Sequence, residues 1–402
     1  MAFVTNNTAA GSNNNNDNDI LVLQKTSGEV HLIRNGRLQQ FPPVLKETVT
    51  SVGEQGMLTI ATKGNNNKVY IYFTEAASMG GQPLGKRVYS YDWNGEQLVN
   101  KTLVKDMPQT QTYHNGGAMT FDKNGTLYIA VGDAGRYGVL QNNPTNADGG
   151  KAPDDTSVIQ QLVPPGPYRA IGVRNSFSLA TDPVTGAIWD TENGDTVYDE
   201  INIVPPNFNS GWNAIMGPAH NYNKTQLDRL TTTVQGQNYV YHDPQFSWEK
   251  PIAPTGLAFV PPNSEAFAAK YGNSLFVGGF NTGTLYRFQL NENRDGFVFN
   301  SPKLKEDDVA NIGDSQDEIT FGTGFGAITD VMFGPDGFLY VVSLSDGTIY
   351  RIVPASIAAA SENPADASNN PLGGNYPLIA TVLGGGGILG YYFGRKFKRR
   401  RA

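Results

Sequence analysis

The chain has only four histidines, and the surroundings of one of them, His114, suggest chemistry. His114 lies in the segment QTYHNGGAMTFDKNG, where a glycine-rich turn leads into a short apolar run. An imidazole has an ordinary pKa of about 6.5, so it can take up or release a proton at neutral pH. The segment therefore indicates a general base, although a turn histidine that bonds only to the backbone would look the same in the sequence.

Charged side chains beside glycine-rich turns recur in two more segments. Asp133 follows an apolar run in VGDAGRYG, where its carboxylate could orient an imidazole, bind a ligand hydroxyl or satisfy its own turn. Arg174 and Asn175 precede the next apolar run in YRAIGVRNSFSLATD. A cation at that position could polarise a carbonyl or pair with an acid, and a salt bridge between neighbouring sheets is the alternative.

The segment ENGDTVYDEINI, which begins at Glu192, concentrates carboxylate and amide side chains around Gly194. Hard cations such as Ca²⁺ prefer oxygen ligands, and a glycine leaves its carbonyl oxygen open to approach. The spacing does not match an EF-hand loop, so the pattern indicates a cation site without identifying it. The chain contains no cysteine, which excludes thiolate metal sites and cysteine catalysis.

A repeated strand–turn–strand pattern predicts the scaffold that must position these residues. Each copy has a short apolar strand, a turn rich in Asp, Asn, Pro and Gly, and a second strand that ends in Tyr or Trp. Equivalent positions in the six copies are Phe3, Ile60, Phe121, Thr181, Phe259 and Phe333. Because one copy is too small to bury its own apolar face, the repeats predict an all-β fold, a six-bladed β-propeller over residues 1–353, with a large β-sandwich array as the alternative. The inner strands of a propeller begin near its axis, so His114 and Arg174 would face the central cavity.

Both ends of the chain suggest an exported, membrane-anchored protein. Residues 376–393 carry no charge and would span roughly 27 Å as a helix, close to the thickness of the hydrocarbon core of a bilayer. We therefore predict a transmembrane helix at 376–394, after a disordered stalk at 354–375 and before a cytoplasmic basic tail at 395–402. The propeller would lie outside the cell membrane, and a hydrophobic tail packed on the domain is the alternative. No export signal is visible, so we expect a signal segment and a further strand upstream of Met1.

The charge distribution argues against a nucleic-acid partner. The formal net charge is −7, and six basic residues lie in the C-terminal tail, so the rest of the chain carries −13. An acidic body repels phosphate backbones. We expect a small molecule as the ligand of the central cavity.

Together these segments resemble the glucose/sorbosone dehydrogenase family, the soluble-type aldose sugar dehydrogenases that depend on pyrroloquinoline quinone (PQQ). The likeness runs over residues 19–353, nearly the whole body of the chain. The shared motifs, in chain order, are GEQGML at Gly53, YHNGG at Tyr113, VGDAG at Val131, IGVRN at Ile171, TENGDTVYDEINI at Thr191, NSGW ending at Trp212 and APTGLAF at Ala253. Their order and spacing make the resemblance specific.

The resemblance implies oxidation of aldoses to lactones, with PQQ over the central cavity of the propeller. His114 would remove the proton of the anomeric hydroxyl while a hydride passes to a quinone carbon. Asp133 matches the acid near that histidine, and Arg174 and Asn175 match the pair beside the quinone oxygens. The predicted catalytic residues are therefore His114, Asp133 and Arg174.

The resemblance also implies a Ca²⁺ ion under the cofactor. Gly194 and Asp195 match the two residues whose backbone carbonyls hold it. Glu54 falls where the family has a polar residue near the substrate. We include Glu54 and Trp248 with Arg174 and Asn175 among the predicted cofactor-binding residues.

The chain departs from the family where basic residues usually grip the cofactor's three carboxylates. The position in the fifth repeat is Asn281, and those in the sixth are Ala327 and Thr329. Carboxylates left unpaired in a cavity would cost several kcal/mol in lost hydration. Lys250 and Arg287 are the candidates to replace the missing cations.

These observations lead to three hypotheses about the function. The first is a membrane-anchored quinoprotein that oxidises aldoses with PQQ and Ca²⁺. The second is a non-catalytic propeller that keeps the scaffold to bind glycans or a partner protein. The third is a Ca²⁺-dependent hydrolase that uses His114 as its base.

Overall fold

The computed structural model describes residues 1–5, 18–39, 42–63, 67–107, 110–135, 155–230, 233–234, 236–354, 378–379 and 388–393. Parts of several strands follow the alternation of apolar and polar side chains in the sequence. In β7 (Lys68–Ala76), Val69 and Ile71 are fully buried, whereas Tyr70 between them is partly exposed. Further along β7, Tyr72, Phe73 and Thr74 are all buried, so both faces of that part of the strand pack inside the fold.

Asp-rich turns join the first two strands of several repeats. The Asp122 carboxylate accepts hydrogen bonds from the backbone N–H groups of Asn124 and Thr126. Asp182 repeats the arrangement with the N–H of Val184 and the hydroxyl of Thr185. These turns satisfy their own backbone donors, as the turn composition of the repeat predicts.

Five sheets have at least four strands each within residues 2–322. The first contains β1 (Ala2–Thr5), β2 (Asn18–Gln24), β3 (Glu29–Arg34), β4 (Arg37–Leu38) and β5 (Leu45–Lys46). The second contains β6 (Met57–Thr62), β7, β8 (Pro83–Trp93) and β9 (Leu98–Met107). The third contains β10 (Met119–Phe121), β11 (Leu127–Val131), β12 (Val158–Val163), β13 (Tyr168–Ile171), β17 (Phe208–Asn209) and β20 (Val240–Tyr241).

The fourth and fifth sheets follow in the same way. The fourth contains β14 (Ser176–Thr181), β15 (Ile188–Glu192), β16 (Asp199–Ile203), β21 (Phe246–Trp248) and β25 (Val309–Ala310). The fifth contains β22 (Pro254–Phe259), β23 (Ser274–Gly279), β24 (Leu285–Gln289) and β26 (Thr320–Gly322).

The remaining elements are a last sheet, a small hairpin and short helices in the connections. The last sheet contains β27 (Ile328–Phe333), β28 (Leu339–Ser343) and β29 (Thr348–Pro354), extended by β31 (Ile388–Phe393) and β30 (Leu378–Ile379). The hairpin pairs β18 (Thr233–Val234) with β19 (Gln237–Asn238). The helices are η1 (Ala219–Asn221), α1 (Lys224–Leu227), α2 (Glu265–Tyr271) and α3 (Pro302–Asp307).

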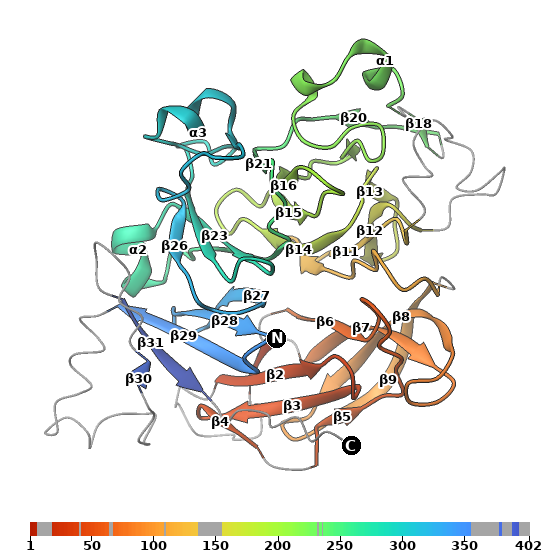
Figure 1. The fold of residues 1–402 in the computed structure, drawn as a ribbon. Helices are drawn as coiled ribbons and strands as arrows, with labels where there is room; N and C mark the ends of the chain where they lie inside the picture. The colour runs from red at the N-terminus through yellow and green to blue at the C-terminus, as the bar shows by residue number, and fades with distance from the viewer. Residues whose placement is uncertain are drawn as a thin grey trace, which may run out of the picture.

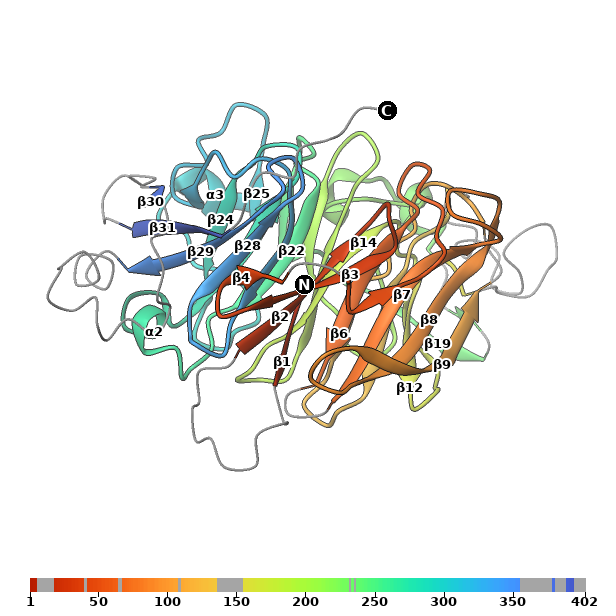
Figure 2. The ribbon, with the colours of Figure 1, turned by 90° about the horizontal axis from the view of Figure 1, so that it is seen from below.

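The sheets stand around one centre in chain order (Figure 1). Their innermost strands are neighbours, since β14 contacts both β10 and β22, and β22 also contacts β27. Seen from below, the first sheet lies between the last sheet and the second (Figure 2). There the rings of Phe3 and Tyr340 meet edge to face with centroids 5.1 Å apart, and Ile20 and Ile349 are buried in the same cluster. The first and last sheets therefore close the circle.

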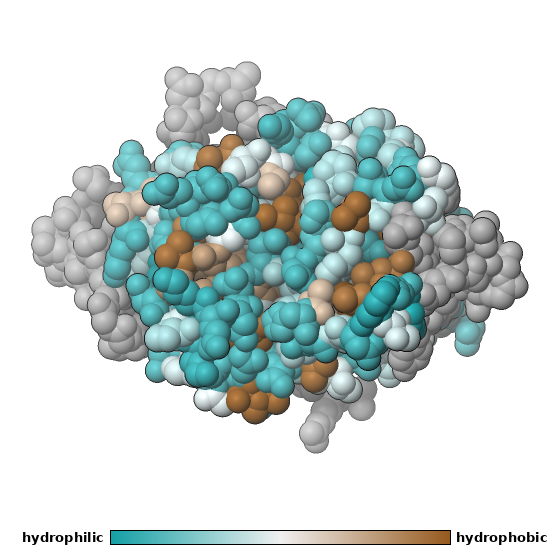
Figure 3. All heavy atoms as spheres, turned by 90° about the horizontal axis from the view of Figure 1, so that it is seen from above, coloured by the Kyte–Doolittle hydropathy of each residue, from teal (hydrophilic) through white to brown (hydrophobic). Residues whose placement is uncertain are grey.

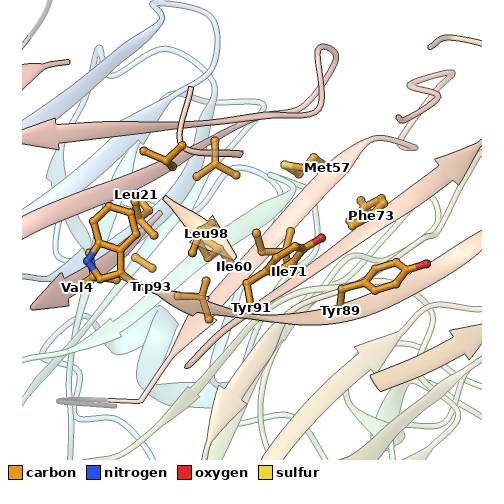
Figure 4. Packing of buried hydrophobic residues seen from close by; sticks show 14 of the residues in the cluster. Val4, Leu21, Met57, Ile60, Ile71, Phe73, Tyr89, Tyr91, Trp93 and Leu98 are labelled. Atoms are coloured by element: carbon orange, nitrogen blue, oxygen red, sulfur yellow. The ribbon is translucent and has the colours of Figure 1, made fainter. Parts of the chain in front are cut away.

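The hydrophobic core lies between neighbouring sheets. Between the first and second sheets, Val4 and Leu21 pack with Ile60, Ile71 and Trp93 (Figure 4). Burial of apolar surface stabilises a fold by about 25 cal/mol per Å². Because each sheet buries its face against the next, the ring is stable only as a whole.

The fold is an all-β propeller, as predicted, but the predicted number of blades and the predicted transmembrane helix are wrong. Only five blades of four or more strands are completed within residues 2–322, not six. The strands after them, β27–β29, are three, and strands from the C-terminal segment extend that sheet. The wrong number of blades concerns the outer edge of β29, because the backbone N–H and C=O groups of an edge strand can pair with any suitable strand.

The predicted transmembrane helix and single-pass membrane location are also wrong. Among the described residues no helix is long and apolar enough to cross a membrane, and the longest helix there, α2, has seven residues. The described parts of the predicted span, 378–379 and 388–393, are strands. Glycine disfavours a helix, and residues 384–387 are four glycines in a row. The predicted stalk from residue 355 and the basic tail lie outside the described residues.

The face seen from above is mainly hydrophilic (Figure 3). Hydrophobic residues reach its surface in small, separate patches. The described residues on this side of the propeller therefore form no broad apolar area for docking.

Candidate active site

Loops at one edge of the sheets bring the predicted catalytic residues together. Because β10 and β11 are antiparallel, the loop before β10 and the loop after β11 lie at the same edge. The register confirms this, since Met119 at the start of β10 faces Ile129 near the end of β11. His114 before β10 and Asp133 after β11 thus meet, and β14 and β15 repeat the arrangement in the next sheet.

His114 and Asp133 form a close pair. Nδ1 of the imidazole is 2.6 Å from Oδ1 of Asp133. Asp133 also accepts the backbone N–H of Gly135 on Oδ1, at 2.8 Å, and the indole N–H of Trp212 on Oδ2, at 2.6 Å. The aspartate side chain is fully buried, while that of His114 is 16% exposed. The imidazole therefore bonds to a buried carboxylate and is itself still partly exposed to solvent.

The surroundings of Asp133 keep its carboxylate ionised. Burial alone would raise its pKa, but hydrogen bonds from His114, Trp212 and Gly135 outweigh burial and hold the pKa below its ordinary value. An ionised carboxylate can only accept hydrogen bonds, so Nδ1 of His114 must carry the proton in this contact. The neutral imidazole then has its lone pair on Nε2, as a general base requires.

Arg174 places a cation beside this pair. Its Nη1 donates to the carbonyl oxygen of Asn193 at 2.9 Å, and its Nη2 lies 3.1 Å from the Asp195 carboxylate. The guanidinium also lies over the Trp212 ring, 5.2 Å from its centroid. Arg174 is 8% exposed, and its Nε is buried with no hydrogen-bond partner among the described residues. The site therefore has a fixed positive charge with one donor to spare.

Asn175 joins the strand after Arg174 to two other loops. Its Oδ1 accepts the N–H of Gly116 at 3.2 Å, and its Nδ2 lies 3.3 Å from Oε2 of Glu54. Glu54 also accepts the N–H of Asn115 at 3.1 Å. Because Asn115 follows His114, the network fixes the loop before β6 beside this histidine and brings a second carboxylate to the site.

The close approach of these loops requires a glycine at position 132. A Cβ on Gly132 would lie 2.3 Å from the carbonyl oxygen of His114 and 2.9 Å from that of Arg174. Real Cβ atoms do not come so close to oxygen, so any side chain would push the two carbonyls away. The bare backbone at 132 therefore allows the close approach of the His114 and Arg174 segments.

The loop that carries Gly194 and Asp195 is anchored by Asp199. Oδ1 of Asp199 accepts the N–H of Gly194 at 2.8 Å, and Oδ2 accepts those of Ile252 and Ala253 at 2.6 and 2.7 Å. Asp199 is 1% exposed, and burial raises its pKa to about 6. The aspartate thus fastens this loop to the start of the fifth sheet.

The predicted Ca²⁺ site gains no support from side chains. No group of three or more His, Asp or Glu residues in the described part of the chain is arranged to hold a metal ion. The carboxylate of Asp195 pairs with Arg174 instead. The Ca²⁺ prediction therefore rests on the backbone carbonyls of Gly194 and Asp195 alone.

Three more carboxyl groups are buried behind the site. Asp190 and Glu192 lie on β15 and Glu200 on β16, and none is more than 1% exposed. Burial raises the pKa of all three, that of Glu192 to about 7. Glu192 accepts the N–H of Arg174 at 2.6 Å and the hydroxyl of Ser210 at 2.5 Å. It therefore holds the backbone turn on which Arg174 sits.

One predicted cofactor-binding residue does not join the site. Trp248 is fully buried on β21, where its ring packs against Phe246, Tyr286 and Phe288 in the core between the fourth and fifth sheets. Its ring therefore has a packing role in the structure, away from His114.

The positions expected to grip the cofactor's carboxylates carry no charge in the structure either. Asn281 lies in the exposed turn after β23, Ala327 precedes β27, and Thr329 lies within it. Arg287 does not replace them, since it lies over the Tyr271 ring of α2 and bonds to Ser274. Lys250 is exposed in the loop after β21, close in sequence to the segment that Asp199 anchors.

Sequence reasoning missed the roles of Trp212 and Asp199. Both lie in segments that the sequence marked, NSGW and YDEINI, but no role followed from their spacing. Asp199 bonds to backbone at the start of the fifth sheet, and Trp212 lies three residues beyond β17, which pairs in parallel with β13. Such contacts depend on the path of the chain, which local patterns do not show.

The sequence of the chain is similar to those of known sugar dehydrogenases. A family model described as Glucose / Sorbosone dehydrogenase matches residues 11–351. Aldose sugar dehydrogenase YliI of Escherichia coli (strain K12) is 25% identical over 353 residues, which cover 84% of this chain and 87% of that protein. An uncharacterized protein, slr1608 of Synechocystis, is 26% identical over 365 residues, covering 83% and 81%.

Solved structures share the fold. A putative oxidoreductase (glucose dehydrogenase) from Thermus thermophilus superimposes with a TM-score of 0.61 and 24% identity, covering 81% of this chain and 87% of that chain. The PQQ-bound aldose sugar dehydrogenase of Streptomyces coelicolor superimposes with a TM-score of 0.56 and 20% identity, covering 93% of this chain and 90% of that chain. The soluble aldose sugar dehydrogenase of E. coli, in its apo form, superimposes with a TM-score of 0.57 and 21% identity, covering 80% of this chain and 91% of that chain. At these identities the structural matches establish the propeller fold.

Proposed function

Because the chain belongs to the glucose/sorbosone dehydrogenase family, we propose that it oxidises aldose sugars to lactones at the site around His114. The observation that carries the proposal is the pair of His114 and Asp133, 2.6 Å apart, with Arg174 fixed beside it. The family resemblance predicted from the motifs is thus confirmed, and the names of the relatives support a sugar as the substrate.

In the proposed reaction His114 is the general base. Its Nε2 takes the proton of the anomeric hydroxyl as the hydride leaves the same carbon, which becomes the lactone carbonyl. Asp133 holds Nδ1–H and stabilises the imidazolium that results. Because Asp133 is buried and its pKa is lowered, it stays ionised and orients the imidazole without taking the proton itself.

Arg174 would stabilise negative charge that develops near it during hydride transfer. Its guanidinium is fixed by Asn193, Asp195 and the Trp212 ring, so little reorganisation is needed at the moment of reaction. Glu54 lies within the same network through Asn175 and would accept a hydrogen bond from a sugar hydroxyl.

The residues present fit the quinone part of PQQ. The buried Nε of Arg174, which has no hydrogen-bond partner in the described part of the chain, is a donor suited to a quinone oxygen, and Arg174 and Asn175 would hold that edge of the cofactor. PQQ, when bound, supplies the carbon that accepts the hydride. The PQQ-bound relative from Streptomyces supports this choice of cofactor.

We also propose that the site binds Ca²⁺. The carbonyl oxygens of Gly194 and Asp195 would supply ligands, and water and cofactor oxygens would have to complete the coordination, because Ca²⁺ takes six to eight oxygens. Asp199 supports this role by fixing the N–H of Gly194 and thereby the loop.

A second function is favoured by one observation. The neutral residues Asn281, Ala327 and Thr329 stand where cofactor carboxylates would need cations. A propeller of this family that binds glycans or a protein without redox chemistry would have no need of those cations.

A titration of the full chain with PQQ decides between the two functions. We expect calorimetry to show stoichiometric binding that strengthens when CaCl₂ is added, and dye-linked oxidation of aldoses by the loaded protein. His114→Gln, as control, should bind PQQ but lose turnover. Absence of PQQ binding, with or without Ca²⁺, together with no oxidation across a panel of aldoses would refute the dehydrogenase and leave the binding function.

A further inference from the structure

Trp212 reaches the site from the outer part of the third sheet. Beyond β17, which runs parallel to β13, the N–H groups of Ser210 and Trp212 each donate to a carbonyl, those of Ile171 and Gly172, at 3.0 Å. Gly172 lies two residues before Arg174. Trp212 is therefore fastened to the segment that carries the cation of the site, and it is only 7% exposed.

The indole of Trp212 is bonded to the acid that orients the base. Its Nε1 donates to Oδ2 of Asp133 at 2.6 Å, whereas Oδ1 serves His114 and the N–H of Gly135. The two carboxylate oxygens thus have different partners. A carboxylate with a partner on one oxygen only can rotate about its Cβ–Cγ bond, and the indole opposes that rotation.

The same side chain also supports the cation. The guanidinium of Arg174 lies over the Trp212 ring at 5.2 Å from its centroid, a distance at which a cation is attracted to an aromatic face. Trp212 therefore touches the partner of the base on one side and the fixed positive charge on the other.

We propose that Trp212 is a positioning residue, whose indole N–H fixes the Asp133 carboxylate toward His114 and whose ring fixes Arg174. The inference rests on the proposed oxidation, in which His114 is the base. A tryptophan that only fills space would make the same ring contacts, so the N–H must be tested apart from the ring.

Trp212→Phe keeps an aromatic ring and removes the N–H. We expect kcat for aldose oxidation to fall about ten- to a hundred-fold with little change in KM, the loss typical of a hydrogen bond to a charged group. In an Asp133→Asn background the same substitution should add little, because the link acts through that carboxylate. Trp212→His, which restores a ring N–H, should recover part of the loss, whereas a packing role would make the smaller histidine worse than phenylalanine.

A second readout does not need activity. In Trp212→Phe the pKa of Asp133 should rise, because one of the donors that lower it is lost. His114, Arg174 and Glu192, which are the other charged groups near Asp133, are unchanged in the variant. Carboxyl ¹³C NMR measures the titration of Asp133.

Trp189→Phe is the matched control. Trp189 is fully buried, and its Nε1 has no hydrogen-bond partner among the described residues, so this change costs packing but no such bond. Equal losses of kcat in the two variants, or an unshifted titration of Asp133 in Trp212→Phe, would overturn the inference. If the unaltered protein oxidises no aldose, the proposed function fails, and the NMR titration still decides whether Trp212 holds Asp133.

Discussion

Substitution of Gly132 by alanine tests whether the spacing of base and cation controls the rate. The added Cβ would lie 2.3 Å from the carbonyl oxygen of His114, against 3.4 Å or more for ordinary contact, so that carbonyl must retreat by about 1.1 Å. The carbonyl of Arg174, 2.9 Å away, must move as well. The methyl group thus acts on both sides of the site at once.

A shift of that size has a predictable effect. Misplacing a reacting group by about 1 Å can cost roughly a hundredfold in rate. Overpacking of this kind costs about 1–3 kcal/mol in the free energy of unfolding, which leaves most proteins folded. We therefore expect Gly132→Ala to fold, to lose some degrees in Tm and to lose about a hundredfold in kcat for aldose oxidation.

Gly296→Ala is the control. The atom nearest to a Cβ at Gly296 is a side-chain nitrogen of Asn291, at 3.3 Å, and the loop lies after β24, away from His114. Its Tm and kcat should stay close to those of the unaltered protein. Steady-state kinetics and thermal unfolding of both variants suffice. A folded Gly132→Ala protein with unaltered kcat would refute the claim that this backbone contact sets the geometry of the site.

Two further predictions concern the buried acids. Because burial raises the pKa of Glu192 from 4.5 to about 7, its contribution to stability is complete below pH 4.5 and is lost as the pH rises through 7. As the pH rises from 5 to 8, the stability of Glu192→Gln relative to the unaltered protein should therefore increase, by up to roughly 3 kcal/mol in the free energy of unfolding. Parallel profiles of Tm against pH for the two proteins would contradict this. Asp199→Ala leaves three buried N–H groups without their acceptor, at roughly 1–3 kcal/mol for each that finds no other, so Tm should fall sharply. An unchanged Tm would show that water or a shifted loop replaces the carboxylate.

The central pairings of the site could be anticipated because they depend on local rules. In an antiparallel hairpin the start of one strand and the end of the next share an edge, which brings His114 to Asp133. The same rule brings Arg174 to the Asn193 carbonyl across β14 and β15. The motifs contain the segments that the structure brings together.

The other contacts depend on how distant segments cross, which the sequence does not state. Trp212 meets Asp133 only because a segment beyond β17 runs alongside β13. Trp248 is among the predicted cofactor-binding residues, and the structure places it in the core between two sheets.

The errors at the C-terminus have a similar cause. An uncharged stretch of membrane-spanning length indicated a helix, but strand β31 pairs with the edge of β29. Hydropathy of a segment records how apolar it is, whereas the partner that covers it is set by the unpaired edges left in the fold.

One measurement tests the central claim most directly. The full chain is loaded with PQQ and mixed with an excess of an aldose without any dye, and the quinone absorbance is followed in a single turnover. We predict complete reduction of the bound quinone in the unaltered protein, and a rate at least about a hundredfold lower in His114→Gln at equal PQQ occupancy. Equal rates in the two proteins, or no reduction in either despite bound PQQ, would contradict the role of His114 as the base of aldose oxidation.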